Sequence, residues 1–270
     1  MIQKFKRKAQ AAEGLLPPST STTTITTQEE EEDRDEAAEE EEDLVAARSI
    51  FENATRNTPL IDKFNIALTT NELDCLVGSN WLNDEVINFY MQMIQERNVK
   101  QRAQGQDIWK IFVFNTFFYA KLTGGHAPDV NYDYQAVRRW TKRQKVDLFE
   151  RDLILVPLHV NELHWTLGVV DMRKGKRKIY FFDSLKGCNK TWFTTMRRYL
   201  QDEYLDKHGE KLEEIDDWYI PPDFRSEDYT PQQENGYDCG VFICQMAECI
   251  ADGREFDFNQ THIPHMRVKM

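Results

Sequence analysis

The sequence predicts an α+β domain behind a polar N-terminal tail. Three β-type runs, at 152–160, 164–170 and 178–184, follow one another with short polar turns between them, so they are expected to pair as neighbouring strands. An apolar pattern at helical spacing covers 241–250 and stops near Gly253, a residue that suits a helix C-terminus. These strands and this helix together make α+β the expected class.

The first 57 residues are expected to form a disordered tail, and residues 58–270 a single folded domain. Residues 19–27 are nearly all Ser and Thr, and residues 28–43 carry twelve carboxylates against the single Arg34, with no aromatic residue in either stretch. Such segments cannot bury enough apolar surface to offset the entropy of ordering.

The acidity of the chain belongs to this tail. Residues 28–43 carry a net charge of −11 and residues 1–27 carry +3, so only −4 of the total −12 belongs to residues 44–270. The folded domain is therefore close to neutral, and the low pI does not make it a binder of basic partners. For the acidic run we favour solvation and spacing over a specific docking role.

The cysteines favour a reducing compartment and no metal site. The chain has five, an odd and scattered set without Cys-x-x-Cys spacing: Cys75, Cys188, Cys239, Cys244 and Cys249. The last three recur every five residues, and at about 100° per helical residue each step turns the side chain to a different face, so they do not converge on one ion. We expect no metal and no cofactor.

No part of the sequence predicts a membrane or nucleic-acid partner. The N-terminus begins no apolar leader, and no run is long enough to span a bilayer. The short basic run Lys4–Lys8 fits a nuclear-import patch, although such runs often arise by chance. We expect an intracellular monomer that acts in the nucleus, with the cytoplasm as the alternative.

Cys239 is the candidate nucleophile. It opens the predicted helix behind a loop at 231–238, and in a first helical turn the unpaired N–H groups and the positive end of the macrodipole favour thiolate over thiol. A lone cysteine at a helix start is more often a small buried apolar residue. The interpretation therefore depends on partners elsewhere in the chain.

Three other residues complete a set for acyl transfer, which needs a base, a group that orients the base, and donors for an oxyanion. His164 opens the second predicted strand and Asp183 lies near the end of the third, so strand pairing can bring imidazole and carboxylate together. Gln233 precedes Cys239 by six residues, close enough for its amide to lie beside the Cys239 backbone N–H. Taken separately, Asp183 or Gln233 would be read as a turn residue.

Other histidines compete for the role of base. His159 closes the first strand and could line the same cleft, whereas His262 and His265 lie in a polar C-terminal segment with no obvious partner. His164 is preferred because strand geometry pairs it with Asp183.

Several motifs, in order along the chain from about Leu60 to the C-terminus, resemble the Ulp/SENP family of SUMO-specific cysteine proteases. They are Trp81-Leu82-Asn83-Asp84 with the segment to Tyr90, Phe114-Asn115-Thr116-Phe117-Phe118, Val156-Pro157-Leu158-His159, His164-Trp165, Phe182-Asp183-Ser184 and Gln233 to Gly240. A series of motifs at compatible spacing is far more specific than a lone Cys or His.

The resemblance implies a papain-like fold, in which helices flank a mixed central sheet and the nucleophile lies at a helix N-terminus. It implies hydrolysis after the C-terminal Gly-Gly of SUMO, in SUMO precursors, in SUMO-conjugated proteins or in both. In this family pattern Cys239 is the nucleophile, His164 the general base, Asp183 its orienter and Gln233 an oxyanion-hole donor.

The resemblance also implies a substrate site. A slot with aromatic walls can select glycine, because only glycine lacks a Cβ. Trp165 and Trp81 resemble the family's tunnel tryptophans, although tryptophan is mostly buried wherever it occurs. The segment around Trp81 also fits a helix N-terminus capped by Asn83 or Asp84.

Further residues resemble contacts with the ubiquitin-like partner: Asp84, Phe117, Arg139 and His159. An exposed ion pair contributes only about 0.2–1 kcal/mol, so Asp84 is expected to tune affinity rather than chemistry. The alternative for Arg139 is a solvated helix face. Family members often continue beyond the segment at 262–267, so the last helix is expected to be short.

Two rival functions remain open from the sequence. A protease for another ubiquitin-like modifier such as NEDD8, or for a virus-type polyprotein, could carry the same catalytic residues. A non-catalytic module that binds a ubiquitin-like partner is the second rival, and the complete set of catalytic residue types argues against it.

Overall fold

The computed structural model describes residues 45–46, 49–50, 53–55, 57–125, 131–213 and 215–270. The predicted tail, with its basic run at 4–8 and its acidic run at 28–43, lies almost wholly outside these residues. The domain boundary at 57/58 therefore stays a prediction.

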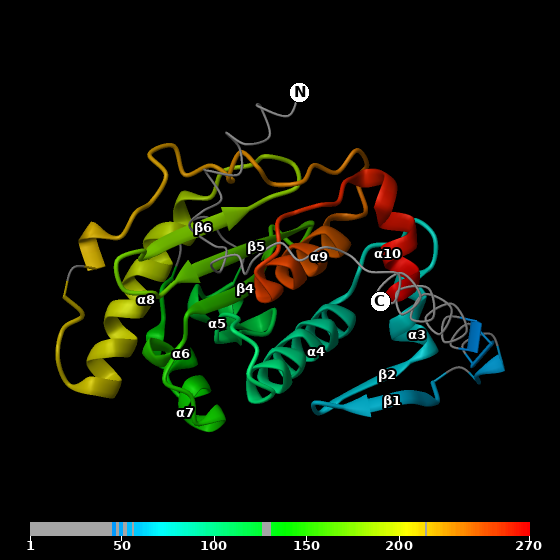
Figure 1. Cartoon of the computed structure of the whole chain (residues 1–270), viewed down its shortest axis with the longest axis horizontal. Coiled ribbons are helices and arrows are strands. Elements are labelled where there is room, and N and C mark those ends of the chain that lie inside the picture. Colours follow the sequence, from blue (N-terminus) through cyan, green and yellow to red (C-terminus); the bar gives the residue numbers. More distant parts are fainter. Residues whose placement is uncertain (1–44, 47–48, 51–52, 56, 126–130, 214) are drawn as a thin grey trace, which may run out of the picture.

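A four-stranded mixed sheet forms the centre of the domain, in the order β3-β4-β5-β6 (Figure 1). Its strands are β3 (Ile111–Val113), β4 (Leu153–Val160), β5 (His164–Asp171) and β6 (Lys178–Phe182). β3 pairs parallel to β4, and the other neighbours are antiparallel. The three predicted strands are confirmed, with ends that differ by one or two residues. The sequence did not reveal β3, because three residues are too few to show a period.

Helices cover both faces of the sheet. One face packs against α4 (Asp84–Ala103) and α9 (Cys239–Asp252), and the other against α5 (Phe117–Leu122) and α8 (Lys190–His208). Side chains along β6 alternate between the two cores: Tyr180 and Phe182 join the first, whereas Ile179 and Phe181 join the second. The predicted architecture, a mixed sheet flanked by helices, is confirmed.

The start of α4 and both ends of α9 agree with the sequence pattern. α9 is buried along most of its length and ends at Gly253, whose φ of 67° places it in the left-handed region that glycine favours. α4 begins after Asn83, whose side-chain oxygen accepts a hydrogen bond of 2.9 Å from the Val86 backbone N–H. The predicted cap is confirmed for Asn83.

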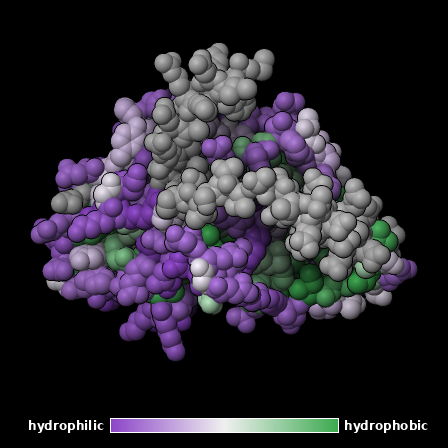
Figure 2. Space-filling model, in the orientation of Figure 1, coloured by the Kyte–Doolittle hydropathy of each residue, from purple (hydrophilic) through white to green (hydrophobic). Residues whose placement is uncertain are grey.

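The remaining elements complete the ends of the domain. They are β1 (Pro59–Lys63) and β2 (Ile66–Thr69), which form a separate antiparallel pair, α3 (Thr70–Leu73), α6 (Tyr134–Val137), α7 (Trp140–Gln144), α10 (Ile263–Lys269), and the 3-10 turns η1 (Asp74–Leu76), η2 (Leu148–Glu150), η3 (Ile215–Asp217) and η4 (Gln260–His262). The last helix, α10, has seven residues. The face shown in Figure 2 is mainly hydrophilic over the described residues. None of the helices in the described part of the chain combines the length and the apolar character that a bilayer span requires.

Candidate active site

Strand pairing brings His164 and Asp183 together. His164 is the first residue of β5, and Asp183 comes directly after β6. Because these strands are antiparallel and Leu167 pairs with Phe182, the start of β5 and the end of β6 lie at the same edge of the sheet. The imidazole Nε2 and the carboxylate Oδ1 are 2.6 Å apart, so they form a short hydrogen bond.

Cys239 joins His164 and Asp183 from a helix that lies later in the chain. It is the first residue of α9, only 2% exposed, and α9 packs directly on β5. Its side chain lies close enough to His164 to help raise the pKa of the imidazole. The structure thus brings together the three residues that the sequence predicts as nucleophile, base and orienter.

The surroundings of His164 favour its protonated form. Burial alone would lower the pKa of this imidazole, but hydrogen bonds from its ring to Asp183 and Cys239 and the negative charges of those partners outweigh burial and raise the pKa to about 9. An imidazolium beside the thiol stabilises a thiolate, the form of cysteine that attacks carbonyl carbon. The arrangement therefore places a protonated imidazole beside the Cys239 side chain at neutral pH.

The pH profile should report this shift. The His164 pKa lies above its ordinary value of 6.5. The stabilisation from the imidazolium is therefore fully present below pH 6.5, and it is lost as pH rises through about 9. We expect kcat/KM to fall on the alkaline side near pH 9. The stability that the His164–Asp183 pair contributes should be lost as pH rises toward the same value. Thermal unfolding across the series separates titration from denaturation. An alkaline limb near the ordinary histidine pKa would contradict the arrangement.

Three backbone and side-chain contacts hold the Asp183 carboxylate and its chain. Oδ1 also accepts a hydrogen bond from the Leu185 N–H at 2.8 Å, and Oδ2 accepts one from the Gly187 N–H at 3.1 Å. The Asp183 backbone N–H donates to the Ser226 hydroxyl at 2.9 Å. Sequence patterns did not point to Gly187 or Ser226. A glycine in the turn after a strand is a signal that could have indicated Gly187. No local pattern indicates Ser226, because it lies 43 residues from Asp183 in the chain.

Gly187→Ala should impair catalysis through this carboxylate. A Cβ added at Gly187 would lie 2.3 Å from Asp183 Oδ2, so the carboxylate or the turn must shift. A displaced catalytic group costs roughly 10- to 100-fold in rate, and we expect kcat to fall by that amount with little change in KM.

Gly175→Ala is the matched control for that variant. Gly175 has a φ of 80°, and its added Cβ would have no atom within 4 Å, so the control strains the backbone without touching a carboxylate. It should lose stability and keep its kcat. Equal kcat values for the folded Gly187→Ala variant and the wild type would refute the steric argument.

Gln233 lies in the loop before α9, where it is buried and held by Ser184 and Asn235. Its backbone N–H donates to the Ser184 carbonyl at 3.0 Å, and its Oε1 accepts from the Ser184 hydroxyl at 2.5 Å. Its Nε2 donates one hydrogen to the Asn235 carbonyl at 2.6 Å, and an amide NH2 has a second. The orientation of the predicted oxyanion donor therefore depends on Ser184, which the sequence showed only as the neighbour of Asp183.

The two tryptophans differ in exposure. Trp165 is 2% exposed, stacks on the His159 ring with centroids 3.9 Å apart, and donates from Nε1 to the Leu82 carbonyl at 3.0 Å. Trp81, the neighbour of Leu82, is 47% exposed. Trp165 is thus part of the core, and it connects β5, the strand that carries His164, to the segment that contains Trp81. Their role as a tunnel stays a prediction.

The other predicted contact residues lie on separate elements. Asp84 is the first residue of α4 and half-buried, Phe117 is the first residue of α5 and 49% exposed, and Arg139 is exposed just before α7. The exposure of Arg139 also suits the alternative of a solvated helix face. Their contacts with a partner stay predictions.

One expectation about the histidines is wrong. His262 has a partner: its Nδ1 accepts a hydrogen bond of 3.1 Å from the Asn259 backbone N–H, which forms one half of a cap at η4. Such a cap usually has Glu or Gln at this position, so the sequence did not suggest it. Across the described residues, no group of three or more His, Cys, Asp or Glu side chains is arranged to hold a metal ion.

Comparison with solved structures supports the same fold. The C-terminal Ulp1 protease domain in complex with Smt3, the yeast ortholog of SUMO, superposes with a TM-score of 0.63 at 27% identity, covering 84% of this chain and 91% of that one. The catalytic domain of the Chaetomium thermophilum Ulp1-like SUMO protease gives a TM-score of 0.64 at 23% identity, covering 95% and 92% of the two chains. The second likeness concerns the fold alone.

Sequence relatives and a family model agree with the structures. Sentrin-specific protease 2 of Homo sapiens is 38% identical over 211 residues, which are 78% of this chain and 32% of that protein. Ubiquitin-like-specific protease ESD4 of Arabidopsis thaliana is 37% identical over 207 residues, which are 76% and 39% of the two chains. The chain thus spans less than half the length of these relatives. The model of the Ulp1 protease family, C-terminal catalytic domain, matches residues 80–270, and this chain belongs to that family.

Proposed function

We propose that this chain is a cysteine protease that cleaves the bond after the C-terminal Gly-Gly of SUMO, in SUMO precursors, in SUMO-conjugated proteins or in both. The observation that carries the proposal is the meeting of Cys239, His164 and Asp183 at the start of α9, with the 2.6 Å hydrogen bond between imidazole and carboxylate. Membership in a family with a member solved in complex with Smt3 supports the substrate class.

In the first chemical step the Cys239 thiolate attacks the carbonyl carbon of the terminal glycine. The oxyanion that forms accepts hydrogen bonds from the Cys239 backbone N–H and the Gln233 amide. The His164 imidazolium gives its proton to the leaving amine, the C–N bond breaks, and a thioester remains on Cys239. Asp183 holds the imidazole in the orientation that both steps need.

In the second step water releases the product. Neutral His164 takes a proton from a water molecule, which attacks the thioester carbon. The C–S bond breaks, the thiolate leaves, and SUMO departs with a free C-terminal carboxylate. The cycle returns the thiolate–imidazolium pair, so it consumes one water and needs no cofactor.

Exposed apolar residues provide the proposed substrate contacts. Trp81 and Phe117 are each about half exposed, so a partner could contact both side chains. Trp81 and Trp165 would enclose the diglycine tail, and Asp84, Phe117, Arg139 and His159 would contact the body of SUMO or its tail. The expected site of action is the nucleus, on the basis of the basic run Lys4–Lys8, and the expected state is a monomer.

Activity-based probes test the proposal. The protein is incubated with SUMO, NEDD8 and ubiquitin that each end in a vinyl sulfone, and adducts are mapped by peptide mass spectrometry. We expect an adduct with the SUMO probe alone, on Cys239. An adduct only with a NEDD8 or ubiquitin probe would refute SUMO as the substrate and would still support Cys239 as the nucleophile. No adduct with any probe would overturn the chemistry.

A further inference from the structure

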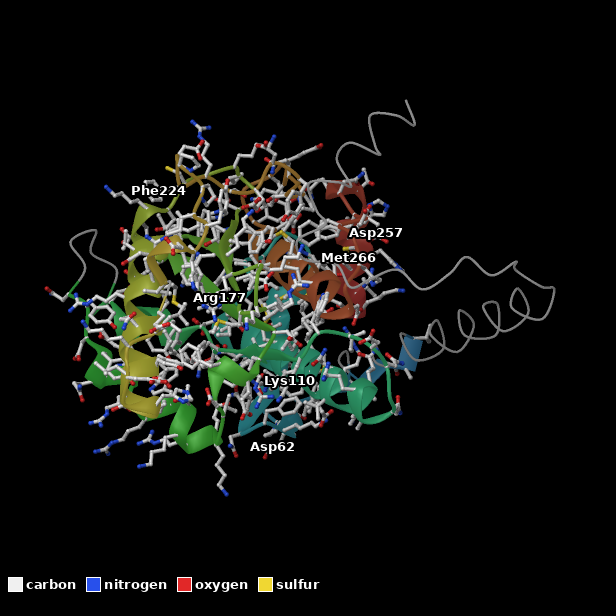
Figure 3. All side chains as sticks on the ribbon, turned by 60° about the vertical axis from the view of Figure 1, so that its left-hand side comes forward. Asp62, Lys110, Arg177, Phe224, Asp257 and Met266 are labelled. Carbon is white, nitrogen blue, oxygen red and sulfur yellow. The ribbon has the colours of Figure 1, made fainter. Side chains whose placement is uncertain are left out.

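A buried arginine from the C-terminal helix holds the loop that precedes the nucleophile. Arg267 lies on α10, next to Met266, which Figure 3 labels, and its side chain is only 5% exposed. Its Nε and Nη2 lie 2.8 and 2.7 Å from Oδ1 of Asp238, which is itself 4% exposed. A buried guanidinium needs such partners, because an unpaired charge in the interior is costly.

The same guanidinium also holds three backbone carbonyls. Nη1 donates to Cys75 at 3.0 Å, and Nη2 donates to Asn80 at 2.7 Å and to Tyr237 at 3.2 Å. Arg267 therefore joins α10, the loop before Cys239 and the segment that leads into Trp81. The fixed, planar fork of arginine suits such a set of acceptors better than the single ammonium of lysine.

Asp238 serves this clamp rather than the helix that it precedes. It is the N-cap residue of α9, yet its side chain makes no cap hydrogen bond to that helix. Its Oδ2 instead accepts from the side-chain amides of Asn235 at 2.6 Å and Gln260 at 2.8 Å. Since aspartate is a preferred helix cap, its use elsewhere indicates that the loop geometry has priority at this position.

A second contact from the C-terminal segment fixes the other end of the loop. Oε1 of Gln260 accepts a hydrogen bond of 2.8 Å from the Glu234 backbone N–H. The loop from Glu234 to Asp238 is thus held by η4 and α10. The two proposed oxyanion donors, the Gln233 amide and the Cys239 backbone N–H, belong to the residues directly before and after this loop.

We infer that Arg267 and Asp238 are a positioning pair that sets the nucleophile and its oxyanion donors, and that Arg267 also sets the segment of Trp81. The inference rests on the proposed function for its effect on turnover. Because a shift of the loop misplaces Cys239 relative to His164, it also predicts a change in the reactivity of the thiol itself. That second readout needs no SUMO.

Four variants of the full chain test the pair. Asp238→Asn should lower kcat by roughly 10- to 100-fold with KM nearly unchanged, because Asp238 touches the nucleophile loop and not the segment of Trp81. Arg267→Gln should lower kcat and raise KM, and Arg267→Lys should recover part of the loss in kcat. Arg173→Gln is the matched control, since it breaks another largely buried pair, with Asp171 at 2.6 Å, at the opposite end of β5 from His164.

Alkylation by iodoacetamide supplies the independent readout. Its rate at Cys239 is measured by peptide mass spectrometry, with the exposed Cys188 as internal reference and the folded fraction taken from thermal unfolding. We expect slower alkylation of Cys239 in Asp238→Asn and Arg267→Gln, partial recovery in Arg267→Lys, and the wild-type rate in Arg173→Gln. Wild-type alkylation at Cys239 in folded Asp238→Asn or Arg267→Lys, or an equal loss in Arg173→Gln, would overturn the inference. Failure of the wild type to cleave SUMO would instead count against the proposed function.

Discussion

Replacing Cys239 with serine should remove nearly all turnover and leave SUMO binding almost unchanged. A serine hydroxyl does not ionise beside His164 at neutral pH, so the step that forms the acyl-enzyme loses its nucleophile. Removal of a nucleophile from a catalytic triad costs on the order of 10⁴-fold or more in kcat. Because Cys239 is only 2% exposed and serine is nearly the same size, we expect the fold and the binding surface to persist.

The measurement for this variant combines turnover of a fluorogenic SUMO substrate with the Kd for mature SUMO. Thermal unfolding is the control for folding. Turnover at the wild-type rate in Cys239→Ser would refute the mechanism, and lost binding at an unchanged unfolding temperature would refute the separation of binding from chemistry.

Asp183→Asn should have the second largest effect, roughly 10²- to 10⁴-fold in kcat. The carboxylate accepts hydrogen bonds from His164, Leu185 and Gly187, and a neutral amide cannot accept all three or stabilise an imidazolium. The pKa of His164 should therefore fall from about 9, and the alkaline limb of kcat/KM should move to lower pH. Both readouts depend on the same hydrogen bond of 2.6 Å.

Asp171→Asn is the matched control for that variant. Asp171 is also a buried carboxylate at the end of a strand, and it pairs with Arg173 rather than with a histidine. Its replacement should lower stability and leave the position of the alkaline limb as it is. If Asp183→Asn kept both the wild-type kcat and the wild-type limb, Asp183 would have no orienting role.

Local patterns in the sequence predicted the elements that carry the site. The three neighbouring strands, the helix that opens at Cys239 and ends at Gly253, and the cap at Asn83 follow from period, turn residues and capping chemistry. Strand order then placed His164 near Asp183, because hairpin-linked strands are neighbours in a sheet. The family resemblance added the mixed sheet.

Several supporting contacts could not be predicted, because they join residues that are far apart in the chain. Ser184 orients Gln233 across 49 positions, and Arg267 reaches Cys75 across 192. No local pattern marks a buried arginine in a polar C-terminal segment as a clamp on a loop that lies 30 residues earlier. The burial of Trp165 likewise follows from packing between sheet and helices rather than from its position beside His164.

Hydroxylamine partitioning is the most direct test of the central claim, that Cys239 forms an acyl-enzyme with SUMO. The protein cleaves a SUMO precursor in the presence of increasing hydroxylamine, and the C-terminus of the product is identified by mass spectrometry. A thioester on Cys239 predicts that a growing share of the product is SUMO hydroxamate and that Cys239→Ser forms none. Release of the free acid alone at every hydroxylamine concentration, at an undiminished rate of cleavage, would contradict an acyl-enzyme at Cys239.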